Sequence, residues 1–266
     1  MARSPSIIEL GHWLQSAPGR DLLDWELGHL DAAVTDAFGF HALQLGLPEI
    51  DALRANRMPH RWVADAAAQP AASAALACEF DALPFPSDSI DLVVLPHALE
   101  FAHDPHQVLR EVERVLRPEG RIVITGLNPA SLWGLRQRFS RARLGLPGRG
   151  EPGLPRAGEF IGYWRLRDWL RLLGFAIESG RFGCWKPPLA AERWLQRFDW
   201  MDRVGERWWP VLGAAYLLVA VKRVRGMRLV GLAKAQRAKA PAAAVVAARR
   251  ERAEAAAEST AMEERV

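Results

Sequence analysis

Residues 81–128 constrain the fold more than any other part of the chain. The apolar runs Ile90–Pro96 and Arg121–Thr125 each predict a strand. Between them, Asp104–Leu116 has the periodicity of an amphipathic helix, and Pro118-Glu119-Gly120 is a typical helix stop. A strand–helix–strand unit of this length joins parallel strands. We therefore expect an open α/β sheet in which these two strands are adjacent and parallel.

The polar residues of this stretch follow the expected strands. Asp81 comes just after a strand-like run, Pro96 and His97 end the first apolar strand, and Gly126–Asn128 follow the second. Open α/β sheets bind ligands beyond the carboxyl ends of their strands. The sequence therefore predicts a ligand site at this edge.

The segments DALPFPSDSIDLV and RVLRPEGR, in this order and spacing, resemble class I S-adenosylmethionine-dependent methyltransferases of the kind often called type 11. The close resemblance covers about 50 residues, and a looser one covers about 38–225. It implies a doubly wound, mostly parallel seven-stranded sheet of Rossmann-like type, with helices on both faces. The connections before and after the second strand are short, so we expect a somewhat reduced N-terminal half with at least one flanking helix lost.

Periodicity outside this stretch predicts the other elements. We expect the last strand to lie beside the strand that begins at Phe175, and this pair to be the only antiparallel part of the sheet. The expected helices are Asp21–Phe38, Glu49–Arg57, Trp164–Leu173 and Ala190–Trp209, and the expected strands are His41–Leu47, His60–Asp65, Ala74–Phe80, Phe175–Trp185 and Ala214–Arg223.

Three regions of different composition are expected. Residues 1–19 form an N-terminal segment, and residues 20–225 form the methyltransferase-like domain. The Gly-, Pro- and Arg-rich segment 140–158 within it is typical of a loop or mobile lid. Residues 226–266 form a basic tail rich in Ala, Arg and Glu, which we expect to be disordered or partly helical because it lacks large apolar residues.

The resemblance implies three cofactor-binding elements for S-adenosylmethionine. The first is a glycine turn after the first strand, where this chain has only Gly46, with Pro48 and Ile50 at the other two glycine positions. We interpret this turn as degenerate, because proline has a fixed φ and a β-branched residue resists a positive φ. A plain strand that ends in a proline turn is the alternative.

The second and third elements are acids. Asp65 is placed to bind the ribose hydroxyls, and Asp81, with Ala82 and Leu83, matches the adenine-reading position. We add Pro96 and His97 to the cofactor-binding set, because they end the fourth strand. The alternative for both aspartates is a turn-forming or helix-capping role.

Methyl transfer from a sulfonium requires mainly alignment and exclusion of water, and a general base only where the acceptor must lose a proton. His97 and Glu100 are the candidates for such a base, with hydrogen bonding at a strand end as the alternative. His97, Glu100, His103 and His106 recur every three residues, but Asp104-Pro105 interrupts any regular face, so we expect no metal site.

Charge and composition bear on partners. The net charge is +4, and arginines cluster at Arg136–Arg143 and in the tail, which allows nucleic-acid binding or simply a solvated surface. Two cysteines, no secretory segment and no apolar run longer than Val211–Val221 predict a cytoplasmic protein without a membrane span. The predicted function is methyl transfer to an unidentified acceptor. The alternative is a catalytically degenerate protein of the same fold that acts as a binding or regulatory module.

Overall fold

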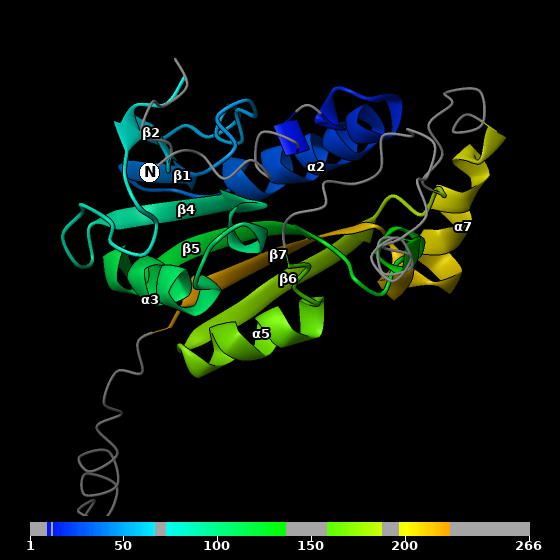
Figure 1. Ribbon diagram of the computed structural model, residues 1–266. Helices are drawn as coiled ribbons and strands as arrows, with labels where there is room; N and C mark the ends of the chain where they lie inside the picture. Colours follow the sequence, from blue (N-terminus) through cyan, green and yellow to red (C-terminus); the bar gives the residue numbers. More distant parts are fainter. Residues whose placement is uncertain (1–9, 12, 67–72, 137–158, 188–196, 224–266) are drawn as a thin grey trace, which may run out of the picture. The chain divides into compact units, whose positions relative to one another are not determined.

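The chain forms a seven-stranded sheet in the order β3-β2-β1-β4-β5-β7-β6, as expected for the fold class (Figure 1). A computed structural model describes residues 10–11, 13–66, 73–136, 159–187 and 197–223. The strands are β1 His41–Leu45, β2 His60–Asp65, β3 Leu76–Ala77, β4 Ile90–Pro96, β5 Leu116–Leu127, β6 Phe175–Gly183 and β7 Ala215–Lys222. The helices are α2 Ala17–Thr35, α3 Pro105–Val115, α5 Tyr163–Leu172 and α7 Asp199–Trp208, with short 3-10 helices η1 Ala98–Glu100 and η2 Pro210–Leu212.

The strands β1 to β5 pair in parallel, so the prediction that β4 and β5 are parallel neighbours is confirmed. The prediction of a single antiparallel pair is wrong. Strand β7 lies between β5 and β6 and is antiparallel to both. All residues of β7 except the last are buried, and a strand covered on both faces is typical of a sheet interior.

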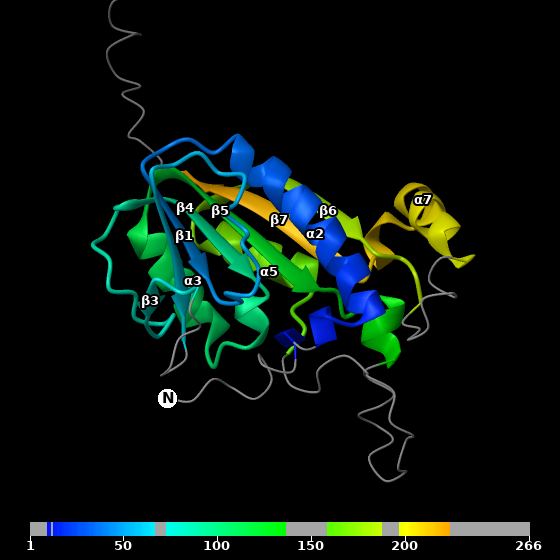
Figure 2. The same ribbon diagram turned by 90° about the horizontal axis from the view of Figure 1, so that it is seen from above.

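Helix α2 covers one face of the sheet, and α3 and α5 cover the other (Figure 2). Helix α2 begins at Ala17, four residues before the expected Asp21, because the Ser16 hydroxyl accepts a hydrogen bond from the Gly19 amide and caps the helix. Its buried apolar stripe includes Leu22, Leu30 and Val34. The preceding Leu10, Trp13 and Leu14 are buried in the same cluster.

The opposite layer follows the sequence closely. Asp104 caps α3 by accepting hydrogen bonds from the amides of His106 and Gln107, which fixes the start of the helix. The buried residues of α3 and α5 recur at helical spacing and pack against the sheet: Val108, Leu109, Val112, Val115, Leu166 and Leu170. Each such side chain contributes about 1.5–3 kcal/mol of burial free energy.

The N-terminal half is reduced, as predicted. Within the described residues no helix joins β1 to β2 or β2 to β3. The expected helix Glu49–Arg57 is wrong, because this segment forms turns in which the Ile50 carbonyl and the Ala52 amide bond the Gln44 side chain. Strand β3 has two residues, although Ala74–Phe80 was expected.

No helix within the described ranges is both long and apolar enough to cross a bilayer. Cys78 and Cys184 are free thiols. Cys78 is half-buried just beyond β3, and burial raises its pKa to about 11. The loop 140–158 and the tail 226–266 lie outside the described residues.

Candidate functional site

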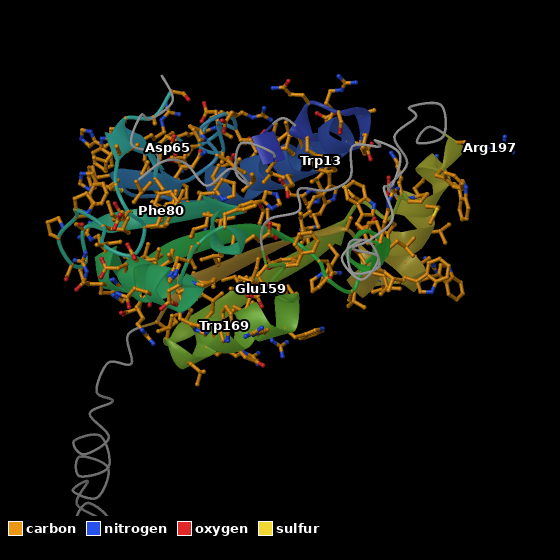
Figure 3. The ribbon with its side chains drawn as sticks, in the orientation of Figure 1. Trp13, Asp65, Phe80, Glu159, Trp169 and Arg197 are labelled. Atoms are coloured by element: carbon orange, nitrogen blue, oxygen red, sulfur yellow. The ribbon has the colours of Figure 1, made fainter. Side chains whose placement is uncertain are left out.

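Most of the predicted site residues lie at the carboxyl edge of the sheet. Gly46 follows β1, Asp65 ends β2, Asp81 lies in the loop between β3 and β4, and His97 follows β4. Because β1, β2, β3 and β4 are parallel neighbours, their carboxyl ends meet at one edge. Asp65 and Phe80 both lie on the β2 side of the molecule in Figure 3.

The turn after β1 is organised by Gln44, a fully buried side chain of that strand. Its Nε2 donates to the carbonyls of Gly46 and Leu47, at 3.1 Å each, and of Ile50 at 2.7 Å. Its Oε1 accepts from the Ala52 amide at 3.0 Å. One side chain therefore satisfies four backbone groups that the missing helix would otherwise pair.

Positive backbone angles in this turn fall on Gly46, with φ 83°, and on the buried Leu47, with φ 42°. They do not fall on Pro48 or Ile50, the two positions at which the resemblance described above implies glycines. The turn thus bends at its first two residues, and only one of them is glycine.

Phe80 packs beside Gly46. A Cβ atom at Gly46 would lie 3.5 Å from the Phe80 ring and 3.5 Å from Cβ of Ala98. Phe80 is 8% exposed, and Asp65 is 2% exposed. The β1 end of the edge is therefore lined by an aromatic ring, and the β2 end carries a buried carboxyl group.

Asp81 is exposed, whereas the backbone that follows it is fixed to α3. The Leu83 amide donates to Glu111 Oε2 at 3.0 Å, and Arg114 donates to the carbonyls of Leu83, at 3.0 Å, and of Phe85, at 2.9 Å. Arg114 also pairs with Glu111 at 2.8 Å, and this bond lowers the pKa of Glu111. The segment after β3 is thereby held while the Asp81 carboxylate faces solvent.

Three ionisable side chains form a buried network where β4 ends. His97 Nε2 lies 2.9 Å from Glu26 Oε1, and His97 Nδ1 lies 3.1 Å from Glu100 Oε2. The side chains of Glu26 and His97 are fully buried, and that of Glu100 is 2% exposed. His97 has φ 50°, a left-handed conformation that histidine adopts more readily than most residues. Its ring therefore joins helix α2 to the end of β4.

Electrostatics favour a charged imidazole in this network. Burial acts to lower the pKa of His97, but the attraction of the Glu26 and Glu100 carboxylates outweighs it, and the pKa lies well above its usual value. Burial raises the pKa of Glu100, and the attraction of His97 partly offsets that rise. One imidazolium between two carboxylates compensates one of the two buried negative charges.

Glu100 also ties the network to β5. Its Oε1 accepts a short hydrogen bond from the Leu127 amide. Gly126 permits this approach, since a Cβ there would lie 2.6 Å from Oη of Tyr216 and 3.2 Å from Glu100 Oε1. Tyr216 donates to the Ile161 carbonyl at 2.8 Å, and burial raises its pKa well above the usual value.

Sequence reasoning missed Glu26 and Gln44. Glu26 interrupts the apolar stripe formed by Leu22, Leu30 and Val34, and an acid in such a stripe signals a buried partner. Gln44 lies within the apolar strand HALQL, which is a comparable signal. In both cases the sequence could have shown that a polar group is buried, but not which group it meets.

The other candidates lie apart from this network. His103 and His106 are exposed, and the His106 ring contacts the Trp169 ring in a tilted arrangement with 3.9 Å between ring centroids. No group of three or more His, Cys, Asp or Glu residues in the described ranges is placed to hold a metal ion. Arg136 is exposed, and the rest of the Arg136–Arg143 cluster lies outside the described residues.

A cleft of about 790 Å³ lies between α2, β6 and α7. Lys186 lies next to it and bridges Asp21 Oδ1, at 2.7 Å, and Asp202 Oδ2, at 3.3 Å. Burial raises the pKa of Asp202, and its bonds to the Trp185 amide and to Lys186 partly offset this rise. None of Gly46, Asp65, Asp81 or His97 lines this cleft: its walls are Asp21, Asp24, Trp25, His29, Ser179, Gly180, Arg181, Phe182, Cys184, Trp185, Asp202, Arg203, Glu206 and Pro210.

Residues 55–124 match the sequence profile of the family described as "Methyltransferase domain". This part of the chain is similar to the methyltransferase-domain family. The family implies S-adenosylmethionine as the methyl donor. The matched region runs from the turn before β2 through β3, β4 and α3 into β5, and so contains Asp65, Asp81, His97 and Glu100.

Relatives and solved structures agree with this family. "Uncharacterized protein YafS" of Escherichia coli K12 is 34% identical over 151 residues, which are 56% of this chain and 58% of that protein. "Malonyl-[acyl-carrier protein] O-methyltransferase" of Laribacter hongkongensis is 35% identical over 103 residues, which are 38% of this chain and 32% of that protein. The chain thus spans less than two thirds of the relatives' length.

The fold of this chain is found in solved structures. A chain of "Complex between the Haloferax volcanii Trm112 methyltransferase activator and the putative methyltransferase" superposes with a TM-score of 0.55 and 18% identity, over 81% of this chain and 98% of that one. A "SAM-dependent methyltransferase, possible histamine N-methyltransferase" from Thermotoga maritima superposes with a TM-score of 0.55 and 14% identity, over 77% of this chain and 90% of that one. At these identities the likeness establishes the fold.

Proposed function

We propose that this protein transfers a methyl group from S-adenosylmethionine, held at the carboxyl edge of β1 to β4, to an acceptor. The observation that carries the proposal is the meeting of Gly46, Asp65 and Asp81 at one edge of a sheet with the family's strand order. Low cysteine content and free thiols favour a cytoplasmic location.

The residues at this edge suit the groups of the cofactor. The exposed carboxylate of Asp81 can accept hydrogen bonds from an amino group, and the carboxyl group of Asp65, at the neighbouring strand end, suits paired hydroxyls. Gly46 has no side chain to obstruct a ligand at the turn. When bound, the sulfonium of S-adenosylmethionine supplies an electrophilic methyl group with a neutral leaving group.

In this proposal His97 and Glu100 position the edge instead of exchanging a proton with the acceptor. Both ring nitrogens of His97 are bonded, and its side chain is fully buried. A raised pKa also keeps the imidazole protonated, so it has no free nitrogen to act as a base. Their role is to hold α2, β4 and β5 together beside the cofactor.

Calorimetric titration with S-adenosylmethionine tests the proposal. We expect Asp81→Ala to weaken binding by about ten- to hundredfold, because a charge-assisted hydrogen bond contributes roughly 1.5–3 kcal/mol. The control is Glu79→Ala, which removes an exposed acid two residues earlier and should leave binding unchanged. Equal affinities for both variants would make Asp81 a turn residue only.

A second candidate is a binding or regulatory module of the same fold without catalysis. Phe80 favours it, because its ring packs where a ligand would approach Gly46. In the enzyme proposal we expect weak binding, with a dissociation constant in the tens of micromolar, roughly −6 kcal/mol. No heat of binding, even with cell extract present as a source of acceptor or partner, would favour the non-catalytic module.

A further inference from the structure

Helix α7 and the 3-10 helix η2 carry an unusual share of exposed apolar surface. Five of the eleven large hydrophobic side chains that are exposed in the described ranges lie within the fourteen residues 199–212, which comprise α7, Trp209 and η2. They are Trp200 at 53%, Trp208 at 71%, Trp209 at 51%, Val211 at 42% and Leu212 at 43% exposure. Concentrated exposed apolar surface marks an interaction site more often than isolated exposed residues do.

The inner side of α7 is fixed to the protein, which determines what its outer side presents. Gly205 lies so close to the Trp185 ring that a Cβ there would approach it to 2.3 Å. Asp202 accepts from the Trp185 amide at 2.9 Å, and the Trp209 carbonyl accepts from Trp185 Nε1 at 2.8 Å. The opposite side of the helix, which carries Trp200, therefore faces solvent. Figures 1 and 2 both show α7 at the periphery, beyond the end of β6.

Exposed arginines accompany the tryptophans on α7. Arg207 and Arg203 lie seven and three residues after Trp200, and Arg203 also borders the cleft beside Asp202. Neither forms an ion pair in the part of the chain that the structure describes, and the protein carries a net charge of +4. Exposed tryptophan combined with unpaired arginine is the composition that favours the interface of an anionic bilayer.

In helix α5, arginine side chains cover the faces of the tryptophan rings, unlike in α7. Helix α5 also exposes a tryptophan, Trp164, at 54%, but the Arg167 guanidinium lies 4.3 Å above that ring, and Arg165 lies 4.9 Å above Trp169. No ring stacking or cation contact in the described structure occupies the faces of Trp200, Trp208 or Trp209. The α7 rings are thus free to enter an interface.

We propose that the surface formed by Trp200, Arg203, Arg207, Trp208 and the η2 residues Val211 and Leu212 docks on an anionic phospholipid bilayer. The tryptophans enter the headgroup region, and the arginines bind lipid phosphates. No helix in the described ranges spans a membrane, so this is attachment at the surface. The proposal does not depend on cofactor binding at the opposite part of the molecule, where Asp65 lies far from Arg197 at the α7 end (Figure 3).

Vesicle flotation of the full chain tests this, with phosphatidylcholine vesicles and with mixed phosphatidylcholine and phosphatidylglycerol vesicles. Binding should require phosphatidylglycerol and weaken as salt is added. The double variant Trp200→Ser/Trp208→Ser should lower the partition coefficient about tenfold or more. The control Trp164→Ser removes an equally exposed ring from α5 and should leave binding unchanged.

A charge variant provides an independent measurement. Arg203→Gln/Arg207→Gln should weaken binding to the anionic vesicles roughly thirtyfold, since each basic residue near such a surface contributes about fivefold. The matched control Arg165→Gln/Arg171→Gln changes two exposed arginines of α5. Circular dichroism melting checks that all variants fold.

Three results would overturn the proposal. The first is no binding of the wild-type chain to anionic vesicles. The second is a loss of vesicle binding in the α5 control variants that equals the loss in the α7 variants. The third is a concentration-dependent dimer in sedimentation that Trp200→Ser/Trp208→Ser abolishes, because the surface would then be covered by a second copy of the chain.

Discussion

Replacing His97 with asparagine tests the buried network directly. His97 is the cation between Glu26 and Glu100, and its own side chain has no solvent exposure. Asparagine tolerates the left-handed backbone at this position, so His97→Asn should not add backbone strain. What changes is the charge, because two buried carboxylates then face each other without a cation.

The expected loss follows from the burial. Removing one partner of a buried charge network costs about 3–5 kcal/mol. That is a large part of the about 5–15 kcal/mol that stabilises a typical protein. The melting temperature should fall by about 6–20 °C, since about 1 kcal/mol corresponds to about 2–4 °C in a domain of this size.

Urea unfolding at pH 7, followed by circular dichroism, measures the change. The control is His103→Asn, an exposed histidine six residues away, which should alter stability by about 0.5 kcal/mol or less. The triple variant Glu26→Gln/His97→Asn/Glu100→Gln removes every charge and should recover much of the loss. A single variant His97→Asn within about 1 kcal/mol of the wild type would refute the network as a stabilising element.

Two further predictions concern pH and the β1 turn. Because folding raises the pKa of His97, protonated His97 contributes its full stabilisation below the unfolded-state pKa of about 6.5. This stabilisation is lost as the pH rises through the folded-state pKa. The difference in unfolding free energy between wild type and His97→Asn should therefore shrink in urea titrations at alkaline pH. A difference that grows with pH would contradict the assigned direction. Gln44→Ala should lower the free energy of unfolding by roughly 2–5 kcal/mol, because three carbonyls and one amide lose their partner. The control is Gln107→Ala on the surface of α3, and equal losses for both glutamines would show that Gln44 does not organise the turn.

The order of the strands from β1 to β5 could be predicted from the sequence because each apolar run has clear ends. Asp104 and Pro105 start α3, and Pro118 to Gly120 separate it from the main part of β5. The structure adds that β5 extends back to Leu116, which pairs with Ile90 across a register shift. Such an irregularity leaves no periodic signal in the sequence.

The place of β7 was only partly predictable. Its almost continuous apolar sequence indicates an interior strand, but local periodicity does not say which neighbours it has. The turn 46–57 was misassigned for a different reason. Its sequence has a helical pattern, yet Gln44 bonds the Ile50 carbonyl, six positions away, and the Ala52 amide, eight positions away. Side-chain competition for backbone groups overrides propensity here.

Some residues of the candidate site could be placed from the sequence, and others could not. Asp65, Asp81 and Gly46 could be placed at the edge because each follows a strand in the sequence. Glu26 could not, because it lies 71 residues from His97 and on a helix that precedes the sheet. A buried acid has a partner that only the fold reveals.

Buried polar groups fix this edge of the sheet at two places, the turn after β1 and the end of β4. Here Gln44 satisfies the turn, and the Glu26 to His97 contact fixes α2 against the end of β4. Apolar packing alone could let α2 slide along the sheet, whereas a charge network has one favourable register. The site geometry therefore depends on a few buried hydrogen bonds, and loss of any of them should displace the edge before it disrupts the apolar core.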